Sequence, residues 1–279
     1  MEDLNQRVVV ITGAGNGIGA GLAHAFADQG AQLVLADLDA SDMEKTRSEL
    51  PAQTRTTLVP VDVSDPEAVS ALAERAFEIC GEVHVLCNNA GVGCSGLAWE
   101  QSLADWEWLL GVNLMGVVHG IHSFVPRMIA QGAPAHVVNT SSMMGLLAAA
   151  GLGAYAASKH AVVALSESLR MDLATHGADV SVSVLCPGPT NTRVYEERGR
   201  PRASKAADAA RPERVAQVAQ LRELMARSMS SRAVADCVVD AVRENRFYVF
   251  PAPEYVAGIE QRYQEIHQQV DARSEEGDS

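Results

Sequence analysis

Residues 8–19 read VVVITGAGNGIG, and this stretch decides the fold. Its first five residues are apolar or β-branched, which is typical of a strand that is covered on both faces. The glycines that follow let the chain turn sharply and enter a helix, whose N-terminus attracts phosphate groups. The turn alone would also suit a plain strand-to-helix connection. Its place after the first strand and before the first helix favours a site for the pyrophosphate of a dinucleotide.

The alternation of short β-branched runs and helical stretches continues along the chain. The expected strands are Val8–Thr12, Gln32–Asp37, Thr57–Asp62, Val83–Asn88, His136–Thr140, Val180–Leu185 and Arg246–Phe250. The helical stretches between them include Gly17–Gln29, Pro66–Cys80, Ser102–Gln131 and Tyr155–His176. The pattern predicts the α/β class: a single-domain, Rossmann-type, doubly wound parallel sheet of about seven strands with helices on both faces. We expect this domain to span residues 1–270, followed by a flexible acidic tail over 271–279.

Length, charge and cysteine content exclude several classes of protein. The chain has 279 residues, of which 47% are hydrophobic, so it can bury a core without disulfides or metal ions. The 22 Lys and Arg against 35 Asp and Glu give a net charge of −13, which argues against binding to nucleic acid or to a membrane surface. No apolar run reaches the roughly 18 residues of a spanning helix, and the first residues, MEDLNQR, show no signal-peptide pattern. The five cysteines form no CxxC pair, so we expect reduced thiols and a cytoplasmic location.

The end of the second expected strand favours one dinucleotide over the other. Asp37 lies near the offset of about 20 residues at which a carboxylate binds the adenosine ribose. A carboxylate there accepts hydrogen bonds from the ribose hydroxyls and repels a 2′-phosphate. Asn16 and Leu38, which could otherwise contact that phosphate, are not basic. The sequence therefore predicts NAD(H) rather than NADP(H).

Further motifs follow the glycine turn in a fixed order. They are Asp62-Val63, the NNAG of 88–91, Asn113, the NTSS of 139–142, the YAASK of 155–159 and Pro187-Gly188. Their order and spacing resemble the short-chain dehydrogenase/reductase family, in its compact single-domain branch with TGxxxGIG, NNAG and YxxxK. The resemblance covers roughly residues 7–250.

The resemblance implies four catalytic residues: Ser142, Tyr155, Lys159 and Asn113. Tyr155 and Lys159 are four residues apart in an expected helix, so they lie on one face, where the ammonium stabilises a phenolate. Tyr155 would take the proton of a secondary alcohol, or return it to a ketone, while a hydride passes to or from nicotinamide. Ser142, with Ser141 as the fallback, would bind the substrate oxygen, and Asn113 would position a water in a proton relay.

The resemblance also implies the residues that contact NAD. In the turn they are Gly13, Gly15, Asn16, Gly17, Ile18 and Gly19, and beside the adenosine they are Asp37, Leu38, Asp62, Val63, Asn88, Asn89, Ala90 and Gly91. Around the nicotinamide they are Tyr155, Lys159, Pro187, Gly188, Thr190 and Thr192. Thr190 departs from the family, which usually has an aliphatic residue there, so Thr192 is the better candidate for the carboxamide contact.

The substrate is less well specified than the cofactor. Ser142 and Tyr155 would contact it, and Met144 and Cys94 are candidate pocket residues. Residues 193–232 lie where the family carries a substrate-covering lid, and their net charge of +5 would suit either an acidic substrate or solvated helix faces. Residues 247–266 resemble, more weakly, family members that oxidise bulky aromatic alcohols, including the benzylic alcohol of lignin-derived dimers. We therefore expect a bulky aromatic or steroid-like alcohol.

Other interpretations remain open at this point. The fold could serve a non-catalytic NAD(H) sensor, although such proteins typically lose the tyrosine or the lysine. Enoyl reduction and sugar epimerisation fit the Tyr–Lys spacing and the glycine turn poorly. His119 and His122 are three residues apart, but no third ligand is recognisable, so we predict no metal site. Trp99, Trp106 and Trp108 are interpreted as packing residues. By resemblance we expect a homotetramer, favoured over a dimer, formed through helices 102–131 and 155–176.

Overall fold

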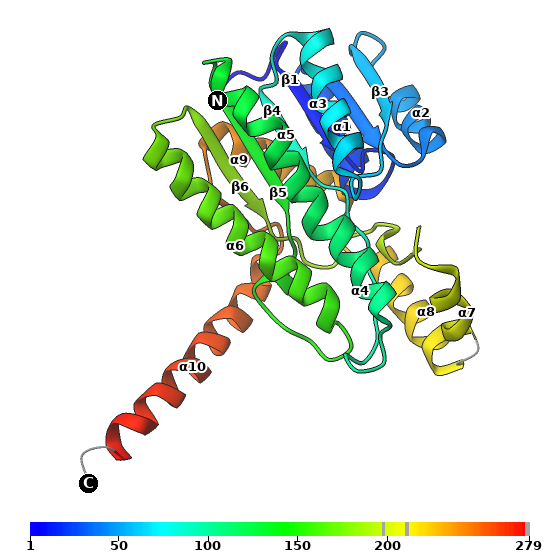
Figure 1. Ribbon diagram of the computed structural model, residues 1–279, viewed down its shortest axis with the longest axis vertical. Helices are drawn as coiled ribbons and strands as arrows, with labels where there is room; N and C mark the ends of the chain where they lie inside the picture. The colour runs from blue at the N-terminus through cyan, green and yellow to red at the C-terminus, as the bar shows by residue number, and fades with distance from the viewer. Residues whose placement is uncertain (197–198, 210–211, 277–279) are drawn as a thin grey trace.

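A computed structural model describes residues 1–196, 199–209 and 212–276 (Figure 1). Its centre is a parallel sheet of seven strands in the order β3-β2-β1-β4-β5-β6-β7. The strands are β1 (Val8–Thr12), β2 (Gln32–Asp37), β3 (Thr56–Pro60), β4 (Val85–Asn88), β5 (Ala135–Thr140), β6 (Val180–Leu185) and β7 (Tyr248–Val249). The predicted doubly wound parallel sheet is confirmed.

Ten α-helices occur in the described residues, and several of them cover the two faces of the sheet. They are α1 (Gly17–Asp28), α2 (Ala40–Glu49), α3 (Pro66–Cys80), α4 (Leu103–Leu110), α5 (Gly116–Ala130), α6 (Gly153–His176), α7 (Arg202–Ala209), α8 (Pro212–Ala226), α9 (Ser231–Glu244) and α10 (Val256–Glu276). In Figure 1, α3, α5 and α6 lie in front of the sheet, α7 and α8 sit beside α4, and α10 projects away from the rest of the chain.

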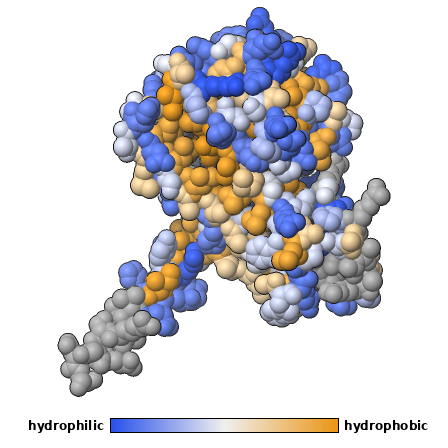
Figure 2. All heavy atoms as spheres, viewed as in Figure 1, coloured by the Kyte–Doolittle hydropathy of each residue, from blue (hydrophilic) through white to orange (hydrophobic). Residues whose placement is uncertain are grey.

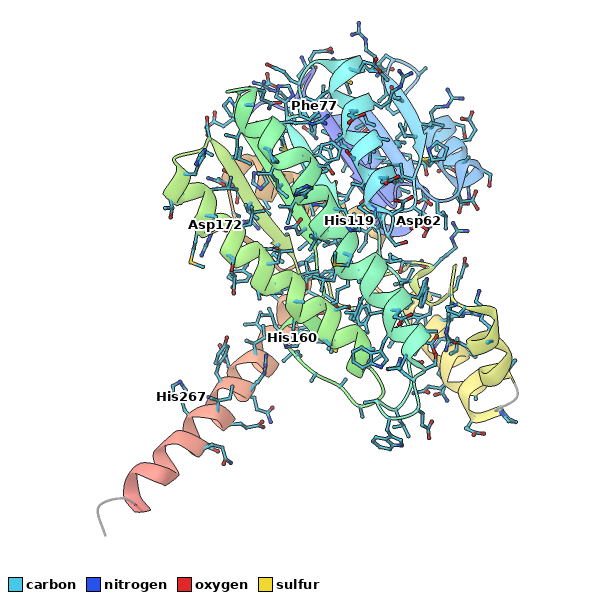
Figure 3. The ribbon with its side chains drawn as sticks, in the orientation of Figure 1. Asp62, Phe77, His119, His160, Asp172 and His267 are labelled. Carbon is cyan, nitrogen blue, oxygen red and sulfur yellow. The ribbon has the colours of Figure 1, made fainter. Side chains whose placement is uncertain are left out.

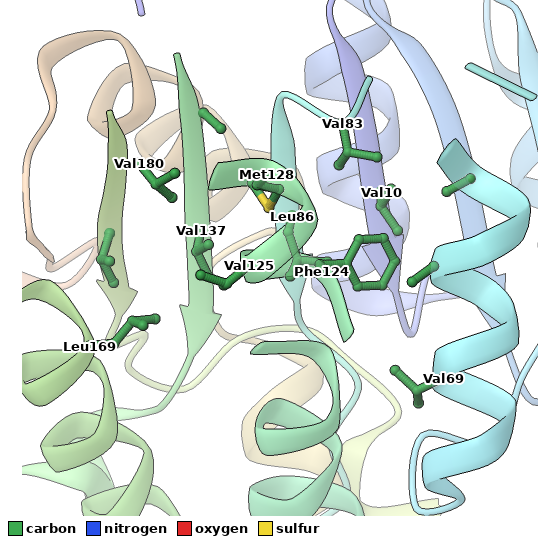
Figure 4. Close-up of a cluster of buried hydrophobic side chains, with 14 of the residues drawn as sticks. Val10, Val69, Val83, Leu86, Phe124, Val125, Met128, Val137, Leu169 and Val180 are labelled. Carbon is green, nitrogen blue, oxygen red and sulfur yellow. The ribbon is translucent and has the colours of Figure 1, made fainter. Parts of the chain in front are cut away.

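Successive strand residues face opposite sides of the sheet, and both sides are buried. In β1, Val8 and Val10 join the hydrophobic cluster under α3, α5 and α6, part of which Figure 4 shows. Val9 and Ile11 join a second cluster under α1 and α9. This two-sided burial explains why β1 reads as a continuous run of apolar and β-branched residues and shows no alternation of apolar and polar ones.

The winding of the chain determines where a site can form. From β1 the chain builds outward to β3, then returns to the other side of β1 to add β4 and the strands after it. The connections therefore leave in opposite directions after β1 and β4, and a crevice opens at the carboxyl ends of these two strands. The glycine-rich turn follows β1, and the NNAG residues follow β4.

Several boundaries differ from the sequence-based expectation. β3 ends at Pro60 rather than Asp62, because Asp62 Oδ1 accepts hydrogen bonds from the N–H and the hydroxyl of Ser64, which turns the chain. The expected helix 102–131 contains a π-helical turn over Gly111–Met115 between α4 and α5. Residues 271–276 of the expected flexible tail continue helix α10, and 277–279 lie outside the described residues.

One helical stretch in the described residues, Leu103–Ala130, is long and apolar enough to cross a membrane by length and composition. The sequence predicts no spanning segment, because no apolar run is long enough. In the structure this stretch packs against α3 and α6, on one face of the sheet. A helix that flanks a globular core passes the same test, so its hydropathy agrees with its place in this fold.

Candidate active site

A cavity of about 890 Å³ opens at the carboxyl ends of the strands. One half is bounded by the glycine-rich turn and by the ends of β2, β4 and β6. The predicted cofactor residues that line it are Gly13, Asn16, Gly17, Ile18, Asp37, Leu38, Asp62, Val63, Asn89, Ala90, Gly91, Tyr155, Lys159, Pro187, Gly188, Thr190 and Thr192. The other half is apolar and lies beyond Ser142 and Tyr155. One cavity thus joins the cleft beside the glycine-rich turn to a hydrophobic pocket.

The glycine-rich turn leaves no room for side chains. A Cβ on Gly19 would lie 2.0 Å from the Gly13 carbonyl oxygen and 2.7 Å from Asn89 Nδ2. A Cβ on Gly13, whose φ is +66°, would lie 2.7 Å from the Ala90 Cα. The turn therefore sits tightly against the end of β4, with the N-terminus of α1 facing the cavity. Such a backbone cradle fits the pyrophosphate of a dinucleotide.

The backbone of Gly15 holds the Asp37 carboxylate in place. The Gly15 N–H donates a hydrogen bond of 2.8 Å to Asp37 Oδ2, and the Asp39 N–H donates one of 3.1 Å to Asp37 Oδ1. These two bonds hold the carboxylate at the end of β2, where Asp37 lines the cavity. Gly15 and Gly19, both predicted cofactor contacts, do not line the cavity: Gly15 orients Asp37, and Gly19 packs under the turn.

The side chain of Asn89 lies at the cavity wall, whereas that of Asn88 lies in the buried interior. The Asn89 amide donates to the Thr12 carbonyl at 3.0 Å, and Asn89 Oδ1 accepts from the Thr140 hydroxyl at 3.3 Å, so it joins three strand ends at the cavity wall. The Asn88 amide is buried and donates to Asn139 Oδ1 at 2.9 Å. The expectation that Asn88 lines the adenosine side is therefore wrong: it is part of the polar interior under α5 and α6.

The segment after β6 closes the cavity from above. The Pro187 carbonyl accepts from the Met143 N–H at 2.9 Å, which ties this segment to the turn that carries Ser142. The Thr190 hydroxyl donates to the Gly188 carbonyl at 3.0 Å and is occupied within its own loop. The Thr192 side chain lies against Gly17, where an added Cβ would be 2.9 Å from Thr192 Cγ2. Of the two threonines, Thr192 lies directly over the glycine-rich turn.

Tyr155, Ser142 and Lys159 come together at the junction of the two halves. Ser142 and Tyr155 both line the cavity, and the Ser142 hydroxyl lies near enough to the Tyr155 phenol to influence its pKa. Lys159 Nζ lies 5.8 Å from the centre of the Tyr155 ring and donates to the Thr140 carbonyl at 3.0 Å. Ser141, the fallback for Ser142, donates instead to the Lys159 carbonyl at 2.8 Å and faces α6. Of the two serines, Ser141 is thus engaged with the backbone of α6, and Ser142 lies beside Tyr155.

Burial shifts the pKa values of both helix residues. Burial raises the pKa of Tyr155 above its usual value, and the hydrogen bond with Ser142 opposes this shift. Burial lowers the pKa of Lys159 to about 8, which the nearby Cys186 thiol opposes. We expected Lys159 to lower the tyrosine pKa, whereas in this structure the shift of Tyr155 is upward because desolvation dominates.

Asn113 lies behind the cavity wall, inside the π-helical turn. Its Oδ1 accepts from the Val92 N–H at 2.8 Å, and its amide donates to the Val92 carbonyl at 3.0 Å and to the Ser158 hydroxyl at 3.2 Å. A Cβ on Gly91 would lie 3.4 Å from Asn113 Oδ1 and 3.5 Å from Lys159 Nζ. Asn113 therefore lies close to the lysine but does not line the cavity. π-Helical turns are frequent at functional sites.

The hydrophobic half contains residues that the sequence did not single out. It is lined by Trp108, Val112, Met144, Ala149, Leu152, Tyr195, Leu221, Leu224, Met225 and Tyr255. Met144 is placed as predicted, whereas Trp108, interpreted as a packing residue, lines the pocket. Cys94 does not: it is buried with Leu109 and Ala154 behind the wall, which corrects its prediction as a pocket residue. Tyr195 and Tyr255 lie in short 3₁₀-helices, over Val194–Glu196 and Pro253–Tyr255. The sequence connected their segments, 193–232 and 247–266, with the substrate but did not single out these two residues.

Arginines in the described part of the segment 193–232 contact other protein groups, and Arg200 attaches it to α4. Arg200 Nε donates to Asp105 Oδ1 at 2.7 Å, and only 3% and 4% of these two side chains are exposed. Burial acts to raise the pKa of Asp105, but hydrogen bonds from Arg200 and Ser102 lower it overall. The Arg222 guanidinium donates to the Tyr195 carbonyl at 3.0 Å. These arginines therefore bind protein groups, and the basic lining residues in the described part of the chain are Lys159 and Arg193.

His119 and His122 do not converge on a common point. His119 Nδ1 lies 2.9 Å from the Val63 carbonyl oxygen, beside the segment that carries Asp62 (Figure 3). His122 is exposed on α5. Their positions give His119 a structural hydrogen bond and His122 a solvated surface.

The chain is similar to known dehydrogenases in sequence and in structure. The short chain dehydrogenase family matches residues 7–203. The 1-deoxy-11-beta-hydroxypentalenate dehydrogenase of Streptomyces exfoliatus is 37% identical over 96% of this chain and 90% of its own. The C alpha-dehydrogenase of Sphingobium sp. (strain NBRC 103272 / SYK-6) is 34% identical over 95% of this chain and 87% of its own. A short-chain dehydrogenase/reductase from Burkholderia phymatum, solved in complex with NAD, is 40% identical with a TM-score of 0.91, covering 96% of this chain and 97% of that chain.

Proposed function

This chain belongs to the short-chain dehydrogenase family, and we propose that it is an NAD(H)-dependent oxidoreductase acting on secondary alcohols or the corresponding ketones. The observation that carries the proposal is that Ser142, Tyr155 and Lys159 line the same cavity, at the point where the cleft meets the hydrophobic pocket. A substrate oxygen placed between the hydroxyls of Ser142 and Tyr155 would have its carbon directed toward the cleft.

The proposed mechanism assigns one task to each side chain. Ser142 donates a hydrogen bond to the substrate oxygen, and Tyr155 exchanges a proton with that oxygen through its phenol. Lys159, held by the Thr140 carbonyl, provides positive charge beside the phenol when it is protonated. Asn113 fixes the backbone around Val92, next to Lys159. NAD, when bound, supplies the hydride acceptor or donor.

The residues present fit an NAD molecule. The cradle at Gly13–Gly19 suits the pyrophosphate, and Asp37, fixed by two backbone N–H groups, suits the hydroxyls of the adenosine ribose. Asp62 and Val63 would contact the adenine, and Asn89, Ala90 and Gly91 would line the adenosine side. Pro187, Gly188 and Thr192 would hold the nicotinamide. The NAD complex of the Burkholderia phymatum relative supports this assignment.

The pocket supports a bulky, uncharged substrate. Its lining side chains are aromatic or aliphatic, and the arginines Arg200 and Arg222 of segment 193–232 bind protein groups instead of facing it. We therefore propose an aromatic or steroid-like alcohol over an acidic substrate. The name of the relative 1-deoxy-11-beta-hydroxypentalenate dehydrogenase, which includes a hydroxylated compound, agrees with an alcohol substrate. Residues 193–232 would form the lid over it.

A panel of secondary alcohols tests the function. NADH formation is followed at 340 nm with benzylic, steroidal and small aliphatic alcohols, using NAD and NADP in separate assays. We expect turnover with NAD and the highest kcat/KM with bulky benzylic or steroidal alcohols. Binding of NADH without turnover of any alcohol or ketone would support a sensor instead.

Asp37 is expected to set the choice of cofactor. Asp37→Ala removes the charge that repels a 2′-phosphate, so the ratio of kcat/KM for NAD to that for NADP should fall at least about tenfold. Asp37→Asn should show part of this effect, because it keeps an acceptor for the Gly15 N–H. Asp65→Ala, at the N-terminus of α3 and outside the cavity, serves as the control. An unchanged ratio in Asp37→Ala would refute the assignment.

We also propose a cytoplasmic homotetramer. All five cysteines of the sequence are described and free, as in a reducing compartment. Figure 2 shows apolar side chains gathered over α5 and α6. Met115, at the end of the π-helical turn that precedes α5, is 40% exposed, and Met171 of α6 is 58% exposed. An exposed apolar face on two adjacent helices suits packing against a second copy of the chain.

A further inference from the structure

Arg193 connects two segments that lie far apart in the sequence. It follows Thr192 in the segment after β6, and its Nη2 lies 2.5 Å from Oδ2 of Asp42, in the first turn of α2. Arg193 Nε lies 3.7 Å from Glu196 Oε2 on its own segment. The side chains of Arg193 and Asp42 are 35% and 16% exposed, so their ion pair is partly shielded from water.

This ion pair spans the glycine-rich turn. On one side, a Cβ on Gly15 would lie 2.7 Å from Asp42 Cβ, so Asp42 rests on the turn. On the other side, Thr192 packs on Gly17. Arg193 itself lines the cavity. The pair therefore joins the two banks of the cleft above the backbone that would hold the pyrophosphate.

The ion pair of Arg193 with Asp42 bridges the cleft but leaves the cavity beneath it open. With the pair formed, one cavity still runs from Asp37, on the α2 side, to Tyr155, on the pocket side. A dinucleotide in that cavity would lie beneath the joined side chains. For so long a molecule to leave sideways over the turn, the contact between Arg193 and Asp42 has to break.

We propose that Arg193 and Asp42 are positioning residues that retain the dinucleotide, by joining the two banks of its cleft while it is bound. The inference rests on the proposed function, since it takes NAD(H) as the occupant. It assigns the two residues to holding the cofactor, with no part in proton transfer.

The test has to separate the effect of the net charge near the phosphates from the effect of the contact between Arg193 and Asp42. Asp42→Asn removes a negative charge near the phosphates, and Arg193→Met removes a positive one, so each changes the electrostatic potential as well as the pair. The double variant Asp42→Asn/Arg193→Met keeps the net charge and breaks the connection. Arg232→Met is the matched control, because Arg232 Nη1 lies 2.7 Å from Asp28 Oδ2 and joins α9 to α1 outside the cavity lining.

The experiment measures the dissociation rate of NADH by stopped-flow fluorescence, with excess NAD as the displacing ligand. We expect the double variant to release NADH about fivefold faster than the unmodified protein, the factor that corresponds to a partly shielded pair. Asp42→Asn should accelerate release less than this, because a charge that repels the phosphates is lost, and Arg193→Met should accelerate it more, because a charge that attracts them is lost. The effects should not add in the double variant, because one connection is lost in each case. Arg232→Met should release NADH at the unmodified rate, and thermal unfolding checks that every variant is folded.

The outcomes separate this inference from the proposed function. Release from the double variant at the unmodified rate would overturn the retaining role and leave the oxidoreductase assignment in place. Equal acceleration in Arg232→Met would also overturn it, because any surface pair would then suffice. If the unmodified protein binds no NADH, the proposed function itself fails, and the retaining role fails with it.

Discussion

Tyr155→Phe is expected to lower kcat by about 10²–10⁴-fold, the range that a positioned acid or base contributes. The substitution removes only the phenol oxygen, which lies near Ser142 at the junction of the cleft and the pocket. The ring can still pack against Cys94, Leu109 and Ala154, so the fold should remain intact. The loss therefore has to come from proton exchange with the substrate oxygen.

The measurement pairs kinetics with binding. The rate of NADH formation is measured with the best alcohol of the panel, and the Kd of NADH is measured by fluorescence titration. We expect the Kd of NADH to stay within about twofold of the unmodified protein. The Ser142 hydroxyl can bind water once the Tyr155 hydroxyl is gone, so the substitution leaves no unsatisfied polar group beside the cofactor. Tyr263→Phe, on the exposed part of α10, is the control. A Tyr155→Phe variant with more than about a tenth of the activity would rule out the phenol as the proton carrier.

Gly19→Ala is expected to abolish NADH binding and to lower the free energy of unfolding by about 1–3 kcal/mol, the usual cost of overpacking. The new methyl group would lie 2.0 Å from the Gly13 carbonyl oxygen, which is backbone and cannot rotate away. To accept it, the turn has to separate from α1, and the cradle for the pyrophosphate is lost. The Kd of NADH and urea unfolding check the two effects.

Gly21→Ala on the same helix separates stability from binding. Its methyl group would lie 2.6 Å from the Ser231 carbonyl oxygen, at the contact of α1 with α9 and away from the cavity. We expect a comparable loss of stability with NADH binding retained. If both variants lose binding equally, the effect of Gly19→Ala is a general loss of structure and says nothing about the cradle.

The fold was predictable because each local signal agreed with the global arrangement. In β1, every residue from Val8 to Thr12 is buried, and a strand covered on both faces has to read as a continuous apolar run. The turn after it contains glycine where the backbone packs too closely for any Cβ. Asp37, Tyr155 and Lys159 were predictable for a related reason: strand ends and one helix face bring them to the same edge of the sheet.

The remaining features depend on contacts between loops, which spacing does not reveal. Tyr195 and Tyr255 reach the pocket from segments without periodicity. Arg193 and Asp42 are 151 residues apart, and only the folded chain brings them together. Cys94 was misplaced because the loop after β4 turns its side chain behind the wall, against Leu109. In each case the tertiary path of a loop decides the outcome.

The π-helical turn at Gly111–Met115 gives the two halves of one long helix different rotational phases. A wide turn takes up one more residue than an α-helical turn, and one residue corresponds to about 100° of rotation. The half before the turn directs Asp105 toward Arg200, and the half after it packs on α3. The contact of α4 with Arg200, beside the pocket, is therefore set independently of the packing of α5 on α3. In a related protein, either of these two contacts could change while the other is kept.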